Sequence, residues 1–425
     1  MKRIIYLILF CTMLLLGLFC LSSCGEEGAT HWYGSYTYTV KDHEVTITGY
    51  TGLGSHVTVP DTIRDMPVVA IDGDFGSVLV KELTIPDSIR KIGVLTFMDC
   101  TELEKVTLGS GIRDIGLHAF DSEKLIYNEY EGGKYLGNEE NPYLALMSVA
   151  SAEIETFVVH PDTVVVAGGA LQSCYRLKEI SFPDKVASLS DWALQYCTSL
   201  ETVHIPASME FVDSWAFERC DALKNIIVDA ENTHYRSIEG SLFSYDGTHM
   251  VRYAVGQEVR TYYVPDGVVS IGSRAFERAD NLHEVVLPDS LESISGWAFD
   301  DCLNLRSVEF GSSLKIIGSQ AFLDCVRLLE ITLPDSLEEI EYCAFQGCER
   351  LKKVTIGTGV TRIGRRTFAG CIALEEVIFL DPTGWKAQPL GWSTDSYDLN
   401  LSDPVQNAKY ITGEHVGRYW SKTSS

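Results

Sequence analysis

The chain has little positive charge for its size. Its 425 residues contain 34 lysines and arginines against 59 aspartates and glutamates, which gives a formal net charge of −25 at pH 7. Binding to nucleic-acid phosphates requires a basic face, so the composition argues against a nucleic-acid partner. The same excess of negative charge disfavours direct adsorption to anionic lipid.

The sequence also lacks the short motifs that mark common active sites. It has no Gly-x-Ser-x-Gly, no His-Glu-x-x-His and no Gly-x-x-x-x-Gly-Lys segment, and its ten histidines are scattered. Among the 12 cysteines there is no Cys-x-x-Cys pair of the kind found in zinc and redox sites. We therefore predict no enzyme activity, no metal site and no cofactor.

Long apolar runs are missing except at the N-terminus. Lys2 and Arg3 precede an apolar run over 4–21, and small residues close this run, as in a secretory signal. Leu21-Ser22-Ser23-Cys24 resembles a bacterial lipobox, in which the cysteine is lipidated and becomes the mature N-terminus. An uncleaved anchor is the alternative.

These features give three predictions about the N-terminus. Residues 1–23 are a lipoprotein signal peptide, Cys24 is lipidated, and residues 24–32 form a polar tether. The protein is then extracytoplasmic, anchored to the bacterial cell envelope through this lipid alone, and exposed at the surface.

The feature that the sequence has in abundance is a unit repeated about every 23 residues. A proline, or a glycine replacing it, marks each copy, and most spacings are 23, with one of 22 and two of 52 and 59. A fixed period of this size is typical of a solenoid, whose long surface favours binding over catalysis. The marker residues are Pro86, Gly109, Pro161, Pro183, Pro206, Pro265, Pro288, Gly311, Pro334 and Gly357.

Each unit begins with a short strand. In the copy at 328–334, Leu328, Ile331 and Leu333 point inward, Glu330 and Thr332 point outward, and a proline ends the strand. A second apolar pair follows, and then an Ala-Phe pair and a cysteine, as in Ala298-Phe299-Asp300-Asp301-Cys302.

This pattern resembles the signature of the BspA-like leucine-rich repeat family, from about Val57 to Phe379. The resemblance implies a parallel-stranded solenoid with strands on one face, and a bacterial surface protein. It also implies adhesin-like binding, since some members bind host proteins, and it supplies no catalytic residues. The predicted fold class is a mainly β repeat solenoid, capped at both ends.

The period also gives the domain organisation. We predict an N-terminal cap and first repeat over 33–83, the solenoid over 84–379, and a C-terminal cap over 380–425 that carries Trp385, Trp392 and Trp420. Two interruptions, at about 121–155 and 229–262, each predict a hairpin, as the Asp246-Gly247 turn indicates.

Eight cysteines recur at one position of the unit. Equivalent positions of adjacent turns point in parallel, so we expect buried free thiols rather than disulfides or metal ligands. Cys343 lies in a different slot, which tryptophan or arginine fills elsewhere, and we expect it to be more exposed. The eight are Cys100, Cys174, Cys197, Cys220, Cys302, Cys325, Cys348 and Cys371.

Two surfaces are candidates for binding. One is the flank carrying Trp192 and Trp215, which occupy equivalent positions of neighbouring turns and should stack or nearly stack, or merely pad the solenoid. The other is the outward strand face over 284–378, expected to be one continuous surface, with Glu284, Glu309, Glu330, Thr332, Lys353 and Glu376 as its candidate residues.

The predicted function is non-catalytic recognition of a protein or glycan partner through the solenoid surface. An enzyme or accessory protein with a site on the hairpin insertions is one alternative. A purely structural component of the envelope is the other.

Overall fold

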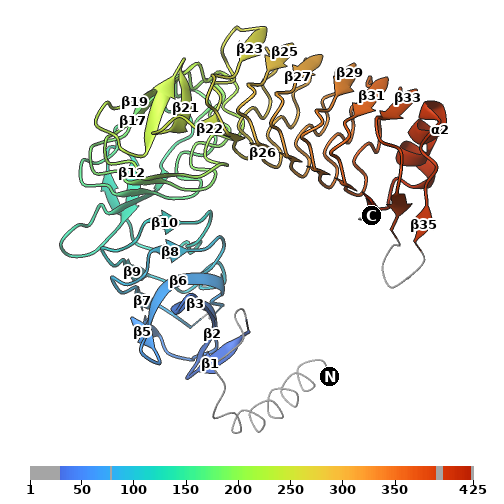
Figure 1. Cartoon of the computed structure of the whole chain (residues 1–425). Coiled ribbons are helices and arrows are strands. Elements are labelled where there is room, and N and C mark those ends of the chain that lie inside the picture. The colour runs from blue at the N-terminus through green and yellow to red at the C-terminus, as the bar shows by residue number, and fades with distance from the viewer. Residues whose placement is uncertain (1–28, 77–78, 389–395, 423–425) are drawn as a thin grey trace.

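The computed structural model describes residues 29–76, 79–388 and 396–422, which form an elongated, curved β-solenoid (Figure 1). The predicted signal peptide, Cys24 and Trp392 lie outside the described residues. Within the described residues, no helix has the length and apolarity needed to cross a bilayer.

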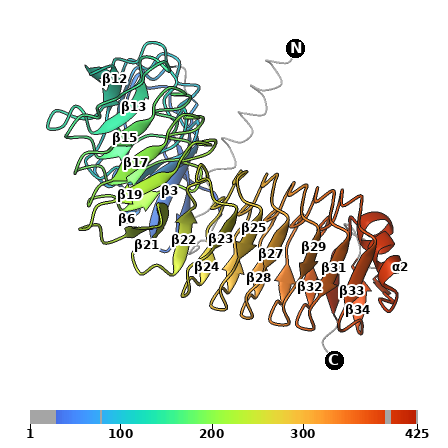
Figure 2. The ribbon, with the colours of Figure 1, turned by 90° about the horizontal axis from the view of Figure 1, so that it is seen from above.

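Each regular turn of the solenoid contributes two short parallel strands, which stack into two ladders. In the first strand, such as β25 (Glu284–Val286), the central residue is buried and its neighbours face outward. The second strand has two residues, as in β26 (Ser293–Ile294). The first ladder lies along the outer edge of the arc and the second along its inner side (Figure 1); Figure 2 shows both from above. The predicted parallel solenoid is therefore confirmed, and the second ladder is an addition to it.

The outer ladder is divided into four three-stranded sheets. These comprise β4 (His56–Thr58), β7 (Glu82–Thr84) and β9 (Lys105–Thr107); β15 (Glu179–Ser181), β17 (Thr202–Ile205) and β19 (Asn225–Val228); β23 (Thr261–Tyr263), β25 and β27 (Ser307–Glu309); and β29 (Glu330–Thr332), β31 (Lys353–Ile356) and β33 (Glu376–Phe379).

The inner ladder runs in three blocks, with parallel pairing between successive turns within each block. These are β8 (Lys91–Ile92) and β10 (Asp114–Ile115); β14 (Val165–Val166), β16 (Ser188–Leu189) and β18 (Phe211–Val212); and β24 (Ser270–Ile271), β26, β28 (Ile316–Ile317), β30 (Glu339–Ile340) and β32 (Arg362–Ile363).

Antiparallel strands occupy the two interruptions of the repeat. The first contains β11 (Asn128–Tyr130), β12 (Gly133–Leu136) and β13 (Ala145–Val149), and β13 pairs in parallel with β14 of the inner ladder. The second contains β20 (Tyr235–Ile238), β21 (Ser241–Ser244) and β22 (His249–Arg252), and β22 continues into β24. The buried apolar core divides at these places into three clusters.

Antiparallel strands cover the N-terminal end. They are β1 (His31–Tyr33), β2 (Tyr36–Lys41) and β3 (Glu44–Tyr50), and β3 pairs in parallel with β6 (Met66–Asp74), which also pairs with β5 (Thr62–Ile63).

The C-terminal end is covered by mixed elements. They are β34 (Trp385–Ala387), β35 (Tyr397–Asp398), α2 (Pro404–Lys409), the π-helical turn η1 (Tyr410–Glu414) and β36 (Trp420–Lys422), with β36 antiparallel to β32. Trp385 and Trp420 are buried against the last turn. Asn407 Nδ2 donates a hydrogen bond of 2.9 Å to Val377 O, so a side chain from α2 satisfies a backbone carbonyl on the outer edge of β33, the last strand of the outer ladder.

Phenylalanines and cysteines fill the core at fixed positions. Successive rings at Phe276, Phe299, Phe322, Phe345 and Phe368 stack with centroids 4.6 to 5.4 Å apart. Each cysteine thiol of this block donates to a phenylalanine carbonyl of the preceding turn, as Cys302 Sγ does to Phe276 O at 3.1 Å.

All eight ladder cysteines are buried free thiols, which confirms the prediction. Burial raises the pKa of Cys220 to about 12, so this thiol stays protonated. The expectation for Cys343 was wrong, because its side chain is only 2% exposed. A single sulfur does not reach out of the turn as the tryptophan and arginine side chains of the same slot do.

Candidate binding site

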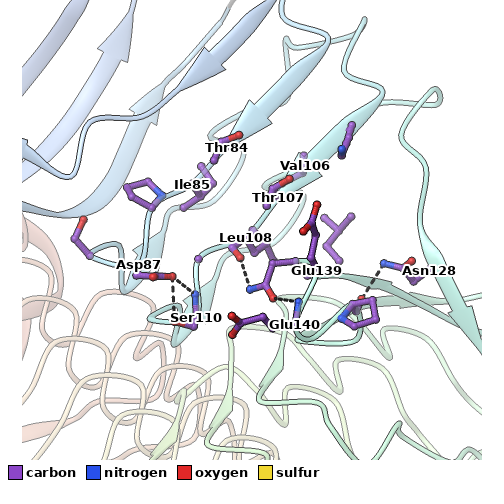
Figure 3. Close-up of a pocket in the computed structure, with 18 of the residues that line it drawn as sticks. Thr84, Ile85, Asp87, Val106, Thr107, Leu108, Ser110, Asn128, Glu139 and Glu140 are labelled. Carbon is purple, nitrogen blue, oxygen red and sulfur yellow. Dashed lines mark hydrogen bonds between the residues drawn. The ribbon is translucent and has the colours of Figure 1, made fainter.

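A cleft of about 930 Å³ lies between the first outer sheet and the first interruption (Figure 3). One wall comes from β7, β9 and the residues that follow each strand, and the opposite wall comes from residues 136–142. The polar and charged lining residues are Asp61, Thr84, Asp87, Ser88, Lys105, Thr107, Ser110, Asn128, Asn138, Glu139 and Glu140.

The cleft exists because the chain departs from the repeat after β9. This strand pairs with β7 on one side. On its other side the described residues supply an isolated bridge between Thr107 and Gly137 in place of a further strand. Leu108 N donates to Gly137 O at 3.0 Å and holds the far wall against the end of β9. Ile126 N donates to Glu104 O at 3.0 Å before the strand, so the edge of β9 is bonded on both sides of Val106 and the cleft opens beside this one residue.

Side-chain hydrogen bonds brace both walls. Asp87 Oδ1 accepts from Ser110 N at 2.7 Å and from Ser110 Oγ at 3.0 Å, which joins two turns of the solenoid. Asn138 Nδ2 donates to Leu108 O at 2.8 Å, and Asn128 Nδ2 donates to Pro142 O at 2.8 Å. Figure 3 draws these bonds, and they give the cleft a preformed shape.

The charge of the cleft is negative. Asp61, Asp87, Glu139 and Glu140 face one lysine, Lys105, and all five side chains are exposed. On the rim, the side chain of Ile126 is 75% exposed and offers an apolar contact. The lining thus favours a cationic partner with an apolar side chain.

The carboxylates do not converge as in an acid–base pair. Glu139 and Glu140 point to different sides in Figure 3, and the lining contains no histidine or cysteine. Ser110 Oγ donates to Asp87, but no base accompanies it to make a nucleophile. Within the described residues, no group of three or more histidine, cysteine or acidic side chains could hold a metal ion. This arrangement of side chains in the cleft is suited to binding a partner.

The strand-face residues lie on the outer ladder, whose hydrogen bonding is interrupted between β27 and β29. Glu284, Glu309, Glu330 and Thr332 are exposed, and Lys353 Nζ lies 3.8 Å from Glu376 Oε2. The expected unbroken register over 284–378 was wrong, because in the described residues no ladder joins β27 to β29.

Phe310 follows β27 beside this break, and its ring packs edge-on against Phe322 with centroids 6.0 Å apart. A phenylalanine in this slot does not by itself break the ladder, because Phe182 and Phe379 occupy the same slot and their strands, β15 and β33, stay paired.

Trp192 and Trp215 are neighbours, as expected, with ring centroids 5.1 Å apart and planes tilted by 52°. Both are half-buried, and other groups engage them. Trp192 Nε1 donates to Glu218 Oε2 at 2.7 Å, and the Arg274 guanidinium lies 3.4 Å from the Trp215 ring centroid. One face of Trp215 is therefore covered within the protein.

Sequence reasoning missed Arg274 and the cleft. Arg274 occupies the same slot as Trp297, exactly one 23-residue period earlier, so the repeat itself could have placed it beside the tryptophans. The cleft had no comparable signal, because it depends on where residues 136–142 fold back against β9.

The fold and the cleft define a capped β-solenoid of the leucine-rich repeat class. The family model for the BspA-type leucine-rich repeat region matches the chain in six copies, over residues 72–135, 150–262 and 253–375. These matches cover more than half of the chain, and the protein therefore belongs to the BspA-type leucine-rich repeat family. Membership in this family suggests a role in protein interaction.

Several solved structures are similar over most of their length. A leucine-rich cell surface protein from Faecalibacterium prausnitzii is 25% identical, with 84% of this chain and 96% of that one covered and a TM-score of 0.48. The pneumococcal vaccine antigen PcpA is 20% identical, with 84% and 88% covered and a TM-score of 0.42. A leucine-rich repeat protein from Bacteroides ovatus is 21% identical, with 82% and 94% covered and a TM-score of 0.38. A search of curated proteins finds no match.

Proposed function

We propose that this protein is a non-catalytic, adhesin-like recognition protein of the bacterial cell surface. It binds a protein partner in the acidic cleft beside β9. The observation that carries the proposal is the cleft itself, where a sheet edge, a braced wall and four acidic side chains come together. A solenoid of this family offers its surface for such contacts.

The chemistry of the cleft defines the kind of segment that would fit. An extended segment in the cleft would lie beside Val106 of β9, between the bonds that Ile126 and Gly137 already make to this edge, and could add a backbone hydrogen bond there as in strand addition. A lysine or arginine of that segment would face Asp61, Glu139 and Glu140. An apolar side chain next to it would cover Ile126. The partner is therefore a protein with an exposed, extended, basic segment.

The test compares the cleft with the strand face. In one variant of the full chain, Asp61→Asn, Glu139→Gln and Glu140→Gln are combined; in the matched variant, Glu284→Gln, Glu309→Gln and Glu330→Gln are combined. Both variants remove three exposed acids. Proteins of the host matrix and of the cell envelope are captured with the wild type, and the affinity of each captured partner is measured for all three chains.

We expect the cleft variant to weaken binding tenfold or more, which corresponds to about 1.4 kcal/mol. The strand-face variant should bind like the wild type. If the strand-face variant alone loses affinity, the site lies on the outer ladder. If both bind like the wild type, the acidic cleft is not the site.

We propose that a lipid on Cys24 attaches the protein to the cell surface, and the lipobox-like sequence around Cys24 supports this. Replacement of Cys24 by alanine should abolish fatty-acid labelling of the protein and release it from the envelope. The other cysteines of the apolar run, Cys11 and Cys20, are expected to be removed with the signal peptide. Labelling that persists in Cys24→Ala would overturn this assignment.

A further inference from the structure

Basic side chains gather on one line of the C-terminal block, although the chain as a whole is acidic. The residue directly before each outer strand from β23 to β31 occupies one slot of the repeat. This slot holds Arg260, His283, Arg306, Leu329 and Lys352 in successive turns. Arg327 and Arg350 lie two residues before the last two of these. Lysine or arginine thus occurs in four of these five turns, and histidine in the fifth, in a protein whose net charge is −25.

Part of this line is hollowed. Arg306, Arg327, Leu329 and Arg350 line a depression of about 280 Å³. It lies just before β27 and β29, where Leu329 N donates to Arg306 O at 3.2 Å and joins the two turns. Leu329 is 42% exposed and is the apolar side chain among these arginines. We call Arg306, Arg327, Arg350 and Lys352 around Leu329 the basic strip.

A second depression continues the first. It has a volume of about 530 Å³ and is lined by Arg260, His283 and Asn304, with Glu258 and Asp280 also in its wall. Arg327 Nη1 donates to Asn304 Oδ1 at 2.7 Å, which places the two depressions side by side. Asp280 is engaged by the backbone, since its Oδ1 accepts from Leu303 N at 3.2 Å.

The cations of the basic strip are not neutralised as other surface cations are. Elsewhere a lysine meets a glutamate one turn away: Lys81 with Glu104 at 3.2 Å, Lys224 with Glu201 at 3.2 Å, and Lys315 with Glu292 at 2.8 Å. Among the ion pairs of the described residues, none involves Arg306, Arg327, Arg350 or Lys352. The pKa of His283 is lowered, first by desolvation and then by the charges of Arg306, Arg260 and Arg327.

We propose that the basic strip binds an extended anionic polysaccharide through carboxylate or sulfate groups repeated along the glycan. Successive turns of the solenoid place equivalent cations about 4.8 Å apart, so a polymer with regularly repeated charges can meet several of them at once. Arginine presents a planar fork of donors that matches such oxyanions. Leu329 offers an apolar floor for a sugar ring.

Two other polyanions fit less well. Single-stranded nucleic acid is held largely by stacking of bases on aromatic side chains, and neither depression is lined by phenylalanine, tyrosine or tryptophan. An acidic peptide usually gains side-chain contacts from deep apolar pockets, and this depression offers one leucine. This site lies far from the acidic cleft in sequence and does not depend on the function proposed for it.

The test uses the full chain and four probes of defined charge: heparin, hyaluronate, polyglutamate and a single-stranded oligonucleotide. Binding is measured by interferometry over a series of salt concentrations. The variant combines Arg306→Gln, Arg327→Gln and Arg350→Gln. The matched control combines Lys81→Gln, Lys224→Gln and Lys315→Gln, which removes three cations that have glutamate partners.

We expect heparin or hyaluronate to bind more tightly than polyglutamate and the oligonucleotide. The arginine variant should weaken glycan binding tenfold or more and reduce its salt dependence, while the lysine control stays within twofold of the wild type. Both variants should keep the melting temperature of the wild type, because the altered side chains are exposed. The proposal is overturned if neither glycan binds, if both variants lose affinity equally, or if polyglutamate or the oligonucleotide binds most tightly.

Discussion

At the first interruption the solenoid is rejoined by backbone groups and two short side chains, whereas at the second it is rejoined by buried arginines. Across the first, Gly168 N donates to Ile115 O at 2.7 Å, Ser190 Oγ accepts from Ile115 N at 3.3 Å, and Asp191 Oδ1 accepts from Leu117 N at 3.1 Å. We call these contacts the first seam and the corresponding contacts at the second interruption the second seam. Ser190 and Gly168 of the first seam are buried, whereas Asp191 is partly exposed.

Across the second interruption, Arg252 holds both sides. Its side chain is 2% exposed, with Nη2 donating to Phe217 O at 3.2 Å and Nη1 donating to Arg274 O at 2.6 Å. Glu277 compensates the charge: its Oε1 accepts from Arg274 Nη1 at 2.7 Å, and its Oε2 lies 3.7 Å from Arg252 Nη1. A buried charge is tolerated when it is paired and hydrogen-bonded. Here the charges are paired, although Arg252 Nε, Arg274 Nε and Glu277 Oε2 have no hydrogen-bond partner among the described residues.

The two interruptions also differ in how they cover the edge of the outer sheet next to them, which is β19 at the second and β9 at the first. At the second, Ile226 N of β19 donates to Gly240 O at 2.7 Å, and Gly256 N donates to Leu223 O at 2.7 Å, so the edge is covered. At the first, Leu108 N donates to Gly137 O and Ile126 N donates to Glu104 O, both at 3.0 Å, and the acidic cleft opens beside Val106 between these two bonds. An insertion can therefore either seal a solenoid or create a binding site in it, depending on where its backbone returns.

The largest expected effect comes from breaking the second seam. Arg252→Met removes two hydrogen bonds to carbonyls and leaves Glu277 buried with one arginine fewer, which should cost about 3–5 kcal/mol of unfolding free energy. The matched change at the first seam, Ser190→Ala, removes one bond to a backbone amide and should cost about 1 kcal/mol. Urea denaturation monitored by circular dichroism measures both. Equal losses in the two variants would contradict the view that the seams differ in kind.

A smaller effect should separate two tryptophans of the same slot. Trp215 stacks on Arg274, which also lies 5.1 Å from the Trp297 centroid, whereas Trp192 bonds to Glu218. Trp215→Leu uncovers the buried guanidinium and should cost about 1–2 kcal/mol more than Trp192→Leu, the value of a desolvated cation–π contact. Urea denaturation measures the unfolding free energy of both variants. A larger loss in Trp192→Leu than in Trp215→Leu would show that the hydrogen bond from Trp192 to Glu218 stabilises the protein more than the cation–π contact does.

The sequence was sufficient for the parts of the fold that repeat. Inward positions such as Leu328 and Ile331 recur every 23 residues, so the strand, its direction and the parallel stacking follow from the period. The inner ladder was missed because a two-residue strand such as β26 is too short to show alternation. Its existence depends on stacking between turns.

The features that do not repeat could not be read in the same way. Arg252 and Glu277 are ordinary charged residues in the sequence, and their burial depends on how β22 returns to the solenoid. The gap in the outer ladder between β27 and β29 has no counterpart in the sequence, because the 23-residue period continues through it. The acidic cleft likewise combines residues near 61, 87, 105 and 139, which only the folded chain brings together.

The smallest effect is a gain in stability at the first seam. Burial raises the pKa of Asp191 to about 6, with further contributions from the negative charges of Asp114 and Asp213, while the bond from Leu117 N acts in the opposite direction. In the unfolded chain this carboxyl titrates near its ordinary value of about 3.9. As the pH rises from about 4 to about 6, the unfolded state therefore loses its proton first, and the folded state becomes less stable relative to it.

Asp191→Asn removes this charge and keeps an oxygen that can accept from Leu117 N. We expect it to raise the unfolding free energy by about 1 kcal/mol at pH 7.5, after allowance for the partial exposure of the group, and to change little at pH 3.5. Asp289→Asn is the control of opposite sign, because hydrogen bonds from Ser312 lower the pKa of that exposed carboxyl and its ionised form is the stabilising one. Denaturation curves at the two pH values measure both variants. A gain in unfolding free energy for Asp191→Asn that is equal at pH 3.5 and pH 7.5 would show that the charge is not its cause. The stability of the first seam would then depend on packing, whereas that of the second depends on its ion pairs.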